Sequence, residues 1–210
     1  IAKPGFGGSI TEDGVAPTMS SIVDARDGRR YYYREIGDRD WFVRNLAYAG
    51  SGVSFEGCDA LDDVYGRYYD WEEAQVACPE GWRLPASDDW ASLAAQAGYN
   101  GEGDGHYLGI AGNLMVNAYF NSNRMWEYWP AVKITNSTGF SAIPTGYCTT
   151  SSAGVDGRDD FNYAVYWTAE DEDVDGESFG LYRMIYVEKP DLMLGATHKT
   201  GFCATVRCVR

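Results

Sequence analysis

The side chains in this sequence with the widest chemistry are its five cysteines, Cys58, Cys78, Cys148, Cys203 and Cys208. A cysteine can be a nucleophile or metal ligand as its thiolate, or it can form a disulfide. Cys78 lies in "ACPEGWRLPASDDW", residues 77–90, at the end of a helical pattern. No neighbouring residue would lower its pKa, and the helix dipole at that end opposes a thiolate. We therefore expect Cys78 to be structural rather than reactive.

The remaining cysteines leave several pairings open. Cys203 and Cys208 are five residues apart, so on one strand their side chains point to opposite faces. Two such sulfurs do not converge on one copper ion, which argues against a metal-dependent oxidase. Cys203 could instead join Cys148 or Cys58, and the sequence does not decide between them. The number of cysteines and the acidic composition favour an oxidising compartment.

Alternating carboxylates in "DEDVDGES" match the first half of a calcium-binding loop, at Asp171, Asp173 and Asp175. The glutamate that completes such a loop is missing, because its position holds Tyr182. We therefore favour a solvated acidic turn, and calcium is the only cofactor that the sequence suggests. His106 and His198 are far apart, and no Gly-x-Ser-x-Gly motif occurs, so no catalytic residue is predicted.

Two helices near the front of the chain would position these groups. Asp70 and Glu73 form a capping-box pattern for a helix that ends at Cys78, where Pro79 disfavours helical geometry. A second helix is predicted from Ser87 to about Gly98, with Trp90, Leu93, Ala94 and Ala97 on its buried face.

Short strands account for most of the rest. "RRYYYREIGDRDWFVRNLAY" predicts a hairpin, and strands are predicted in "GFSAIPTGYC", "NYAVYWTA", "FGLYRMIYV" and "GFCATVRCVR". The second and third of these four would form a hairpin across the acidic turn. Residues 1–21 read as a flexible linker or tail, and residues 22–210 as a single α+β domain.

Composition excludes several classes of function. The net charge of −14 would repel phosphate backbones, so nucleic-acid binding is not expected. No apolar run is long enough to span a bilayer, so no transmembrane segment is expected.

Aromatic residues reach 15%. Trp126 and Tyr128 in "MWEYW" could stack on a carbohydrate or contact a protein if they are exposed.

Ordered motifs carry a resemblance to a known family. "DARDGRRYYYREIGDRDWFVRNLAY", "YGRYYDWEEAQVACPEGWRLPASDDW", "GFSAIPTGY", "YWTAE" and "VRCVR" occur in that order. Together they resemble the Fibrobacter succinogenes major paralogous domain, found in secreted and surface proteins of Bacteroidetes and Fibrobacteres. That family is similar to the C-type lectin-like and formylglycine-generating-enzyme folds. The resemblance implies two helices packed on a small twisted antiparallel sheet with long loops.

The resemblance also implies a disulfide and a place for the ligand. The family commonly keeps cysteines at the positions of Cys78 and Cys208, which implies that these two are joined. In lectin-like relatives the C-terminal strands present a ligand face, and some members resemble targets of diversity-generating retroelements. By that analogy the face would be drawn from residues 171–199. Its candidate residues are Phe179, Arg183, Lys189, Asp191, His198 and Lys199.

The function implied is a non-enzymatic binding or adhesion module of a secreted or cell-surface protein. Its partner would be a surface protein or a carbohydrate. The location would be extracellular or on the bacterial surface, with a lipid anchor on a segment upstream of this sequence. The alternatives are a structural or pilus-associated assembly component and, less favoured, an oxidase of the formylglycine-generating kind, whose catalytic pattern is not recognisable here.

Overall fold

Short antiparallel strands and a few short helices form this mixed α/β chain. The computed structural model describes residues 10–12, 19–101, 105–126 and 133–210. The helices in these residues are α1 (Asp62–Tyr65), α2 (Trp71–Ala77), α3 (Ser87–Gln96) and α4 (Ala111–Leu114). Two turns of 3-10 helix, Phe55–Gly57 and Asp59–Leu61, precede α1.

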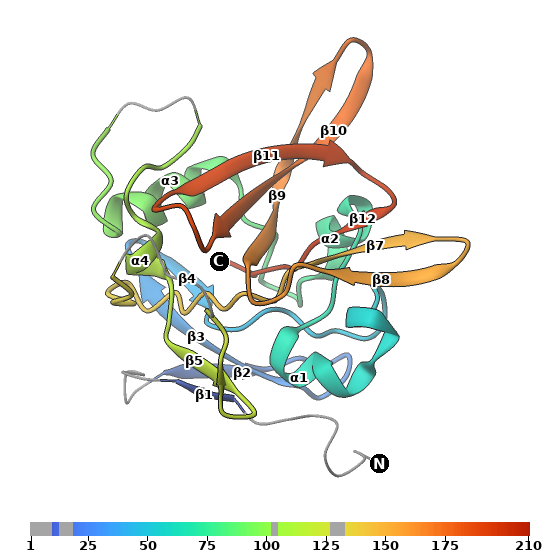
Figure 1. Cartoon of the computed structure of the whole chain (residues 1–210), viewed down its shortest axis with the longest axis horizontal. Coiled ribbons are helices and arrows are strands. Elements are labelled where there is room, and N and C mark those ends of the chain that lie inside the picture. The colour runs from blue at the N-terminus through green and yellow to red at the C-terminus, as the bar shows by residue number, and fades with distance from the viewer. Residues whose placement is uncertain (1–9, 13–18, 102–104, 127–132) are drawn as a thin grey trace.

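The described strands form small three-stranded sheets in which all neighbours are antiparallel (Figure 1). One has the order β2-β3-β4, with β2 (Ser20–Val23), β3 (Arg30–Ile36) and β4 (Arg39–Phe42). A second, β1-β5-β6, joins β1 (Ile10–Glu12), β5 (Ala118–Phe120) and β6 (Asn123–Arg124). A third, β12-β7-β8, joins β12 (Phe202–Cys203), β7 (Tyr147–Ser151) and β8 (Gly154–Arg158). The fourth, β11-β10-β9, joins β11 (Leu192–His198), β10 (Glu177–Tyr186) and β9 (Tyr163–Val174).

Both predicted helices are confirmed, and local sequence explains them. The Asp70 carboxylate accepts a hydrogen bond from the Glu73 N–H, and the Glu73 carboxylate accepts one from the Asp70 N–H, so α2 begins with a complete capping box. Cys78 is extended at the other end of α2, as expected before proline. The α3 helix buries the four predicted apolar side chains.

The first turn of α3 is held by one buried carboxylate. Asp89 accepts hydrogen bonds from the Ala86 N–H at 2.8 Å, from Arg83 at 2.5 and 2.8 Å and from Arg39 at 2.9 Å. Burial alone would raise the pKa of Asp89, but the hydrogen bonds from Arg83, Ala86 and Arg39 outweigh burial and lower it. Arg39 comes from β4, so this cluster ties the helix to the first sheet.

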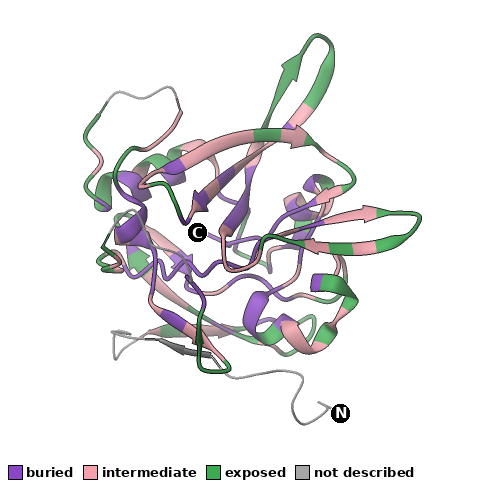
Figure 2. Cartoon of the chain, viewed as in Figure 1, coloured by how far each residue is buried: buried purple, intermediate pink, exposed green. Residues whose placement is uncertain are grey.

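Both predicted hairpins are also confirmed. The first reverses at Gly37, whose φ of +69° a residue with a β-carbon rarely adopts, between β3 and β4. The second turns through Asp175 and Gly176 between β9 and β10. Its strands are longer than the sequence pattern indicates, because they continue as an exposed ribbon beyond the body of the protein (Figures 1 and 2).

Two predicted strands are wrong for most of their length. Residues 139–146 are not a strand: Ser141 and Gly146 have positive φ, and Pro144 cannot donate to a ladder. In "GFCATVRCVR" only β12 is a strand. The residues after it make single bridges to different partners, because the segment crosses several strands instead of following one.

The interior is built around stacked and tilted aromatic rings. Trp41, Trp90, Phe140 and Tyr166 are almost completely buried. The ring centroids of Trp41 and Trp90 are 5.0 Å apart, and those of Phe140 and Tyr166 are 5.6 Å apart. Figure 2 shows buried residues gathered at the centre and exposed residues on the hairpin tips. Half of the aromatic side chains in the described residues are therefore core.

The disulfide that the resemblance implies is present. Cys78 at the end of α2 is bonded to Cys208 near the C-terminus, across a sequence separation of 130 residues. Cys148 and Cys203 lie directly opposite each other on β7 and β12, and both are thiols. Burial raises the pKa of each to about 12, so both are neutral at physiological pH. Cys58 is a half-exposed thiol.

The predicted boundary between a tail over residues 1–21 and a domain over residues 22–210 remains an expectation. The short strand β1 (Ile10–Glu12) lies within the segment that the sequence predicts to be a tail, and it pairs with β5. None of the helices in the described residues is long and apolar enough to cross a bilayer.

Removing the disulfide tests how strongly it holds the fold. We expect Cys78→Ala with Cys208→Ala to lower the free energy of unfolding by about 4–5 kcal/mol, because the unfolded chain gains the entropy of an open loop. Urea unfolding of the double variant and the wild type measures the difference. Cys58→Ala is the control and should change stability by less than about 0.5 kcal/mol. A double variant as stable as the wild type would contradict this prediction.

The Asp89 cluster predicts a pH dependence. A carboxyl whose pKa is lower in the folded state contributes stability above its unfolded pKa, and that contribution is lost as pH falls through the folded pKa. We expect Asp89→Asn to cost about 2–3 kcal/mol at pH 7 and to flatten the loss of stability below about pH 4. Thermal unfolding from pH 7 to pH 2 measures both. Asp88→Asn, an exposed neighbour, should keep the wild-type profile; equal profiles for all three proteins would refute the assignment.

Candidate ligand-binding cleft

The predicted ligand residues on β10 and β11 fall into different environments. Phe179 and His198 lie opposite each other on these strands, with ring centroids 4.9 Å apart. His198 is exposed, and its Nδ1 lies 3.3 Å from Glu177 Oε1. This pair therefore stays at the surface, near the base of the projecting hairpin.

The predicted charged residues are largely engaged within the chain. Lys199 Nζ lies 2.5 Å from the Asp171 carboxylate and 4.0 Å from the centre of the Trp71 ring. Asp191 accepts a hydrogen bond from the Gly109 N–H at 2.8 Å. Lys189 is exposed in the turn after β10.

Two predicted ligand residues are interior. Arg183 is 2% exposed, donates to the Gly105 carbonyl and lies over the Tyr107 ring. Trp126 is fully buried and donates to the Ala142 carbonyl. Neither side chain can contact a ligand at the surface of this structure. Tyr128 lies outside the described residues.

The acidic turn does not assemble a metal site. Asp171 pairs with Lys199, and Asp173 accepts a hydrogen bond from the Gly176 N–H. Asp175 occupies the turn itself, with a φ of 56°. Across the described ranges, no group of three or more His, Cys, Asp or Glu side chains could hold a metal ion.

An aromatic cleft opens instead where β9 and β10 meet β7 and β12. Its volume is about 240 Å³. The lining residues come from these four strands and from the loop before β9; they are Tyr147, Asp159, Tyr163, Val165, Tyr182, Met184 and Phe202. Its four rings are half-buried, whereas Trp167 beside them is fully buried.

Strand alternation explains why these rings face one cleft. Along β9, Ala164 and Tyr166 pack into the central core, so Tyr163 and Val165 point to the other face. Register places Met184 opposite Val165 on β10, and Tyr182 follows two residues away on the same face. The hairpin therefore provides one wall of the cleft.

The other wall comes from β7 and β12, which turn their cysteines inward. Cys148 and Cys203 are buried, so their neighbours Tyr147 and Phe202 point outward. The rings of Tyr147 and Phe202 stack at 5.0 Å, and those of Phe202 and Tyr182 at 5.5 Å. Three rings from three strands thus form a continuous apolar surface around Phe202.

Carboxylates give the cleft a negative potential. Burial raises the pKa of the Tyr163 hydroxyl, and the carboxylates of Asp159 and Glu188 raise it further. Burial also raises the pKa of Tyr147, and the Asp159 carboxylate raises it further. Asp159 lies in the loop between β8 and β9, where its φ is 53°. Its side chain lines the cleft.

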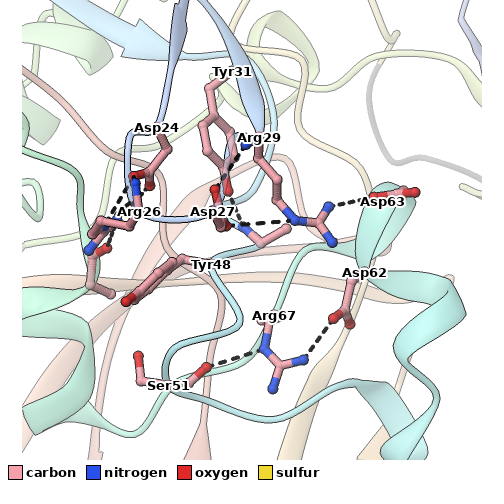
Figure 3. Close-up of polar contacts among 12 residues, drawn as sticks. Asp24, Arg26, Asp27, Arg29, Tyr31, Tyr48, Ser51, Asp62, Asp63 and Arg67 are labelled. Carbon is pink, nitrogen blue, oxygen red and sulfur yellow. Dashed lines mark hydrogen bonds and ion pairs between the residues drawn. The ribbon is translucent and has the colours of Figure 1, made fainter.

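A larger cleft of about 480 Å³ lies beside β2 and β3, and some of its charged lining residues form ion pairs within the chain. Arg29 pairs with Asp63 and lies 3.8 Å from Asp27 (Figure 3). At the edge of this cleft, Asp62 binds Arg67 at 2.7 Å.

The contacts in Figure 3 continue this pattern outside the cleft, where Arg26 binds Asp24 at 2.7 Å and lies over the Tyr48 ring. Arg26, Arg29 and Arg39 therefore pair with carboxylates. Arg30 and Arg44 instead donate to the Ser21 hydroxyl and to the Val43 carbonyl.

Sequence reasoning missed most of the aromatic cleft. Tyr147, Asp159, Tyr163 and Phe202 are not among the predicted ligand residues, and all four lie outside residues 171–199, from which the ligand face was expected. Alternation within "NYAVYWTA" was the available signal. Both of its faces are apolar, so the pattern could not say which one stays open.

The family is identified by a match that covers most of the chain. A family model described as the Fibrobacter succinogenes major domain matches residues 35–210. This agrees with the resemblance carried by the sequence motifs. No curated protein and no solved structure is significantly similar to the chain.

Proposed function

We propose that this chain, which belongs to the Fibrobacter succinogenes major domain family, is a non-enzymatic binding module that holds its ligand in the aromatic cleft. The observation that carries the proposal is the continuous surface of Tyr147, Phe202 and Tyr182, which is partly open to solvent beside a cleft. Covering such rings with a ligand would release ordered water and be favourable.

The architecture supports a lectin-like assignment of the module. The disulfide ties α2 to the last segment of the chain, as the family resemblance implies for a C-type lectin-like domain. The cleft is formed by C-terminal strands, which carry the ligand face in that fold. Its size suits one side chain or one sugar ring, so the ligand would be part of a surface protein or a polysaccharide.

The disulfide also supports a location outside the cytosol. Disulfides persist in oxidising compartments, and a bond between residues 130 positions apart stabilises a protein that meets such conditions. We therefore propose that the module belongs to a secreted or cell-surface protein.

A ligand screen with matched variants tests the proposal. Fluorescently labelled wild type is applied to arrays of surface polysaccharides and of peptides, alongside Tyr163→Ala and Tyr147→Ala. Each variant should bind every wild-type ligand about tenfold more weakly, because one ring contributes about 1 kcal/mol or more to stacking. Both variants should stay folded in urea unfolding.

The control is Tyr32→Ala, which removes an exposed ring from β3, outside the cleft. It should bind as the wild type does. Loss of binding in Tyr32→Ala with unchanged binding in the two cleft variants would place the ligand elsewhere and overturn the proposal.

A further inference from the structure

We propose that the aromatic cleft receives a basic side chain, a lysine ammonium or an arginine guanidinium, from a partner protein. This inference rests on the proposed function, because it names the chemistry of the ligand for the same cleft. It follows from three properties of the described residues: the faces of the rings, the sign of the local charge and the use of similar contacts elsewhere in the molecule.

The cleft provides the ring faces that attract a cation. Phe202 stacks between Tyr147 and Tyr182, and Tyr163 stacks on Tyr186 at 4.6 Å, so the face of each tyrosine that points away from its stack is the one left for a cation. Aromatic faces carry partial negative charge, so a cation held within about 6 Å of several centroids is stabilised by each of them. A volume of about 240 Å³ accommodates the end of a long basic side chain together with its apolar stem.

The charge of the lining has the sign that a cation requires. Asp159 is the charged residue of the lining, and Glu188 also raises the pKa of the hydroxyl of Tyr163. Arg158 is close enough to act on Tyr147, but its guanidinium pairs with Asp156 on the same strand. The net charge of −14 adds a long-range field that attracts basic partners and repels acidic ones.

The chain already places its own cations on aromatic rings elsewhere. The guanidinium of Arg26 lies 3.7 Å from the centre of the Tyr48 ring, and Arg210 lies 4.7 Å from that of Trp82. Within the described residues, no cation–π contact involves Tyr147, Tyr163, Tyr182 or Phe202. The cleft thus has the rings and the carboxylate of such a site, and the cation remains for a partner to supply.

Charge complementarity therefore favours a basic side chain over a neutral sugar. A sugar ring would stack on the same aromatic faces, but it would gain nothing from Asp159 beyond a hydrogen bond and nothing from the field of the protein. A pair of ligands with the same shape and different charge can distinguish these two possibilities.

The test uses two short peptides that differ in one group. One is Gly-Ser-Lys-Ser-Gly with blocked ends, and the other has norleucine in place of lysine, which keeps the apolar stem and removes the ammonium. Each is titrated into the 15N-labelled full chain at low salt. We expect the lysine peptide to shift the amide signals of Tyr147, Tyr163 and Asp159, with an affinity about tenfold higher than that of norleucine.

Two variants test whether the Asp159 carboxylate contributes to binding of the lysine peptide. Asp159→Asn should weaken lysine binding about fivefold while leaving the weak norleucine binding unchanged. Asp175→Asn is the matched control, because it removes an exposed carboxylate at the hairpin tip, and asparagine tolerates its φ of 56°. It should bind the lysine peptide about as the wild type does.

Two outcomes would overturn the inference. If both peptides bind equally, or if the lysine peptide leaves the cleft signals unmoved, the ligand is not selected by positive charge. The proposed function would survive that result if a neutral saccharide from the array shifts the same signals. It would fail together with the inference if every ligand on the arrays bound equally well to Tyr163→Ala and Tyr147→Ala.

Discussion

The rest of the structure depends on the hydrogen bonds that the Arg207 guanidinium donates in the interior. This side chain is fully buried. It donates to Asn45 Oδ1 at 2.7 Å, to the carbonyls of Phe42 and Phe140 at 3.1 and 2.7 Å, and to that of Ser141 at 3.0 Å. These acceptors come from the end of β4 and from the irregular segment before β7, two parts of the chain that no shared sheet connects. Because buried carbonyls need donors, one planar group with five N–H bonds holds both segments in place.

The residues next to Arg207 connect this buried cluster to the cleft through backbone hydrogen bonds and the disulfide. Cys208 accepts a hydrogen bond from the Phe42 N–H and is bonded to Cys78 of α2. Thr205 exchanges hydrogen bonds with β9, accepting from the Trp167 N–H at 3.1 Å. The same run of chain begins at β12, so fixing it also fixes Phe202 between the rings of the cleft. Residues 202–210 therefore contribute both to the buried interior and to the aromatic cleft.

Local chemistry was predictable from the sequence, and long-range placement was not. The capping box at Asp70 and Glu73 specifies its helix with contacts three residues apart, and alternation with a Gly turn specifies the hairpins. The bond from Cys78 to Cys208 followed from the family resemblance. Arg183 was placed on the ligand face by analogy with lectin-like relatives. In the structure it is buried and donates to a carbonyl 78 residues away. The cleft was missed for the same reason: its four rings come from four strands of two sheets, and their open face depends on which side the core covers.

Urea unfolding of Arg207→Met measures how far the fold depends on this guanidinium, because methionine keeps much of the apolar stem and removes every donor. We expect a loss of about 3–5 kcal/mol, or failure to fold, since several buried oxygens lose their partner. Arg210→Met is the control: Arg210 is exposed and pairs with Asp40 at the surface, so its loss should cost no more than about 1 kcal/mol. If Arg207→Met were as stable as Arg210→Met, the C-terminal segment would not depend on this guanidinium, and the account would be contradicted.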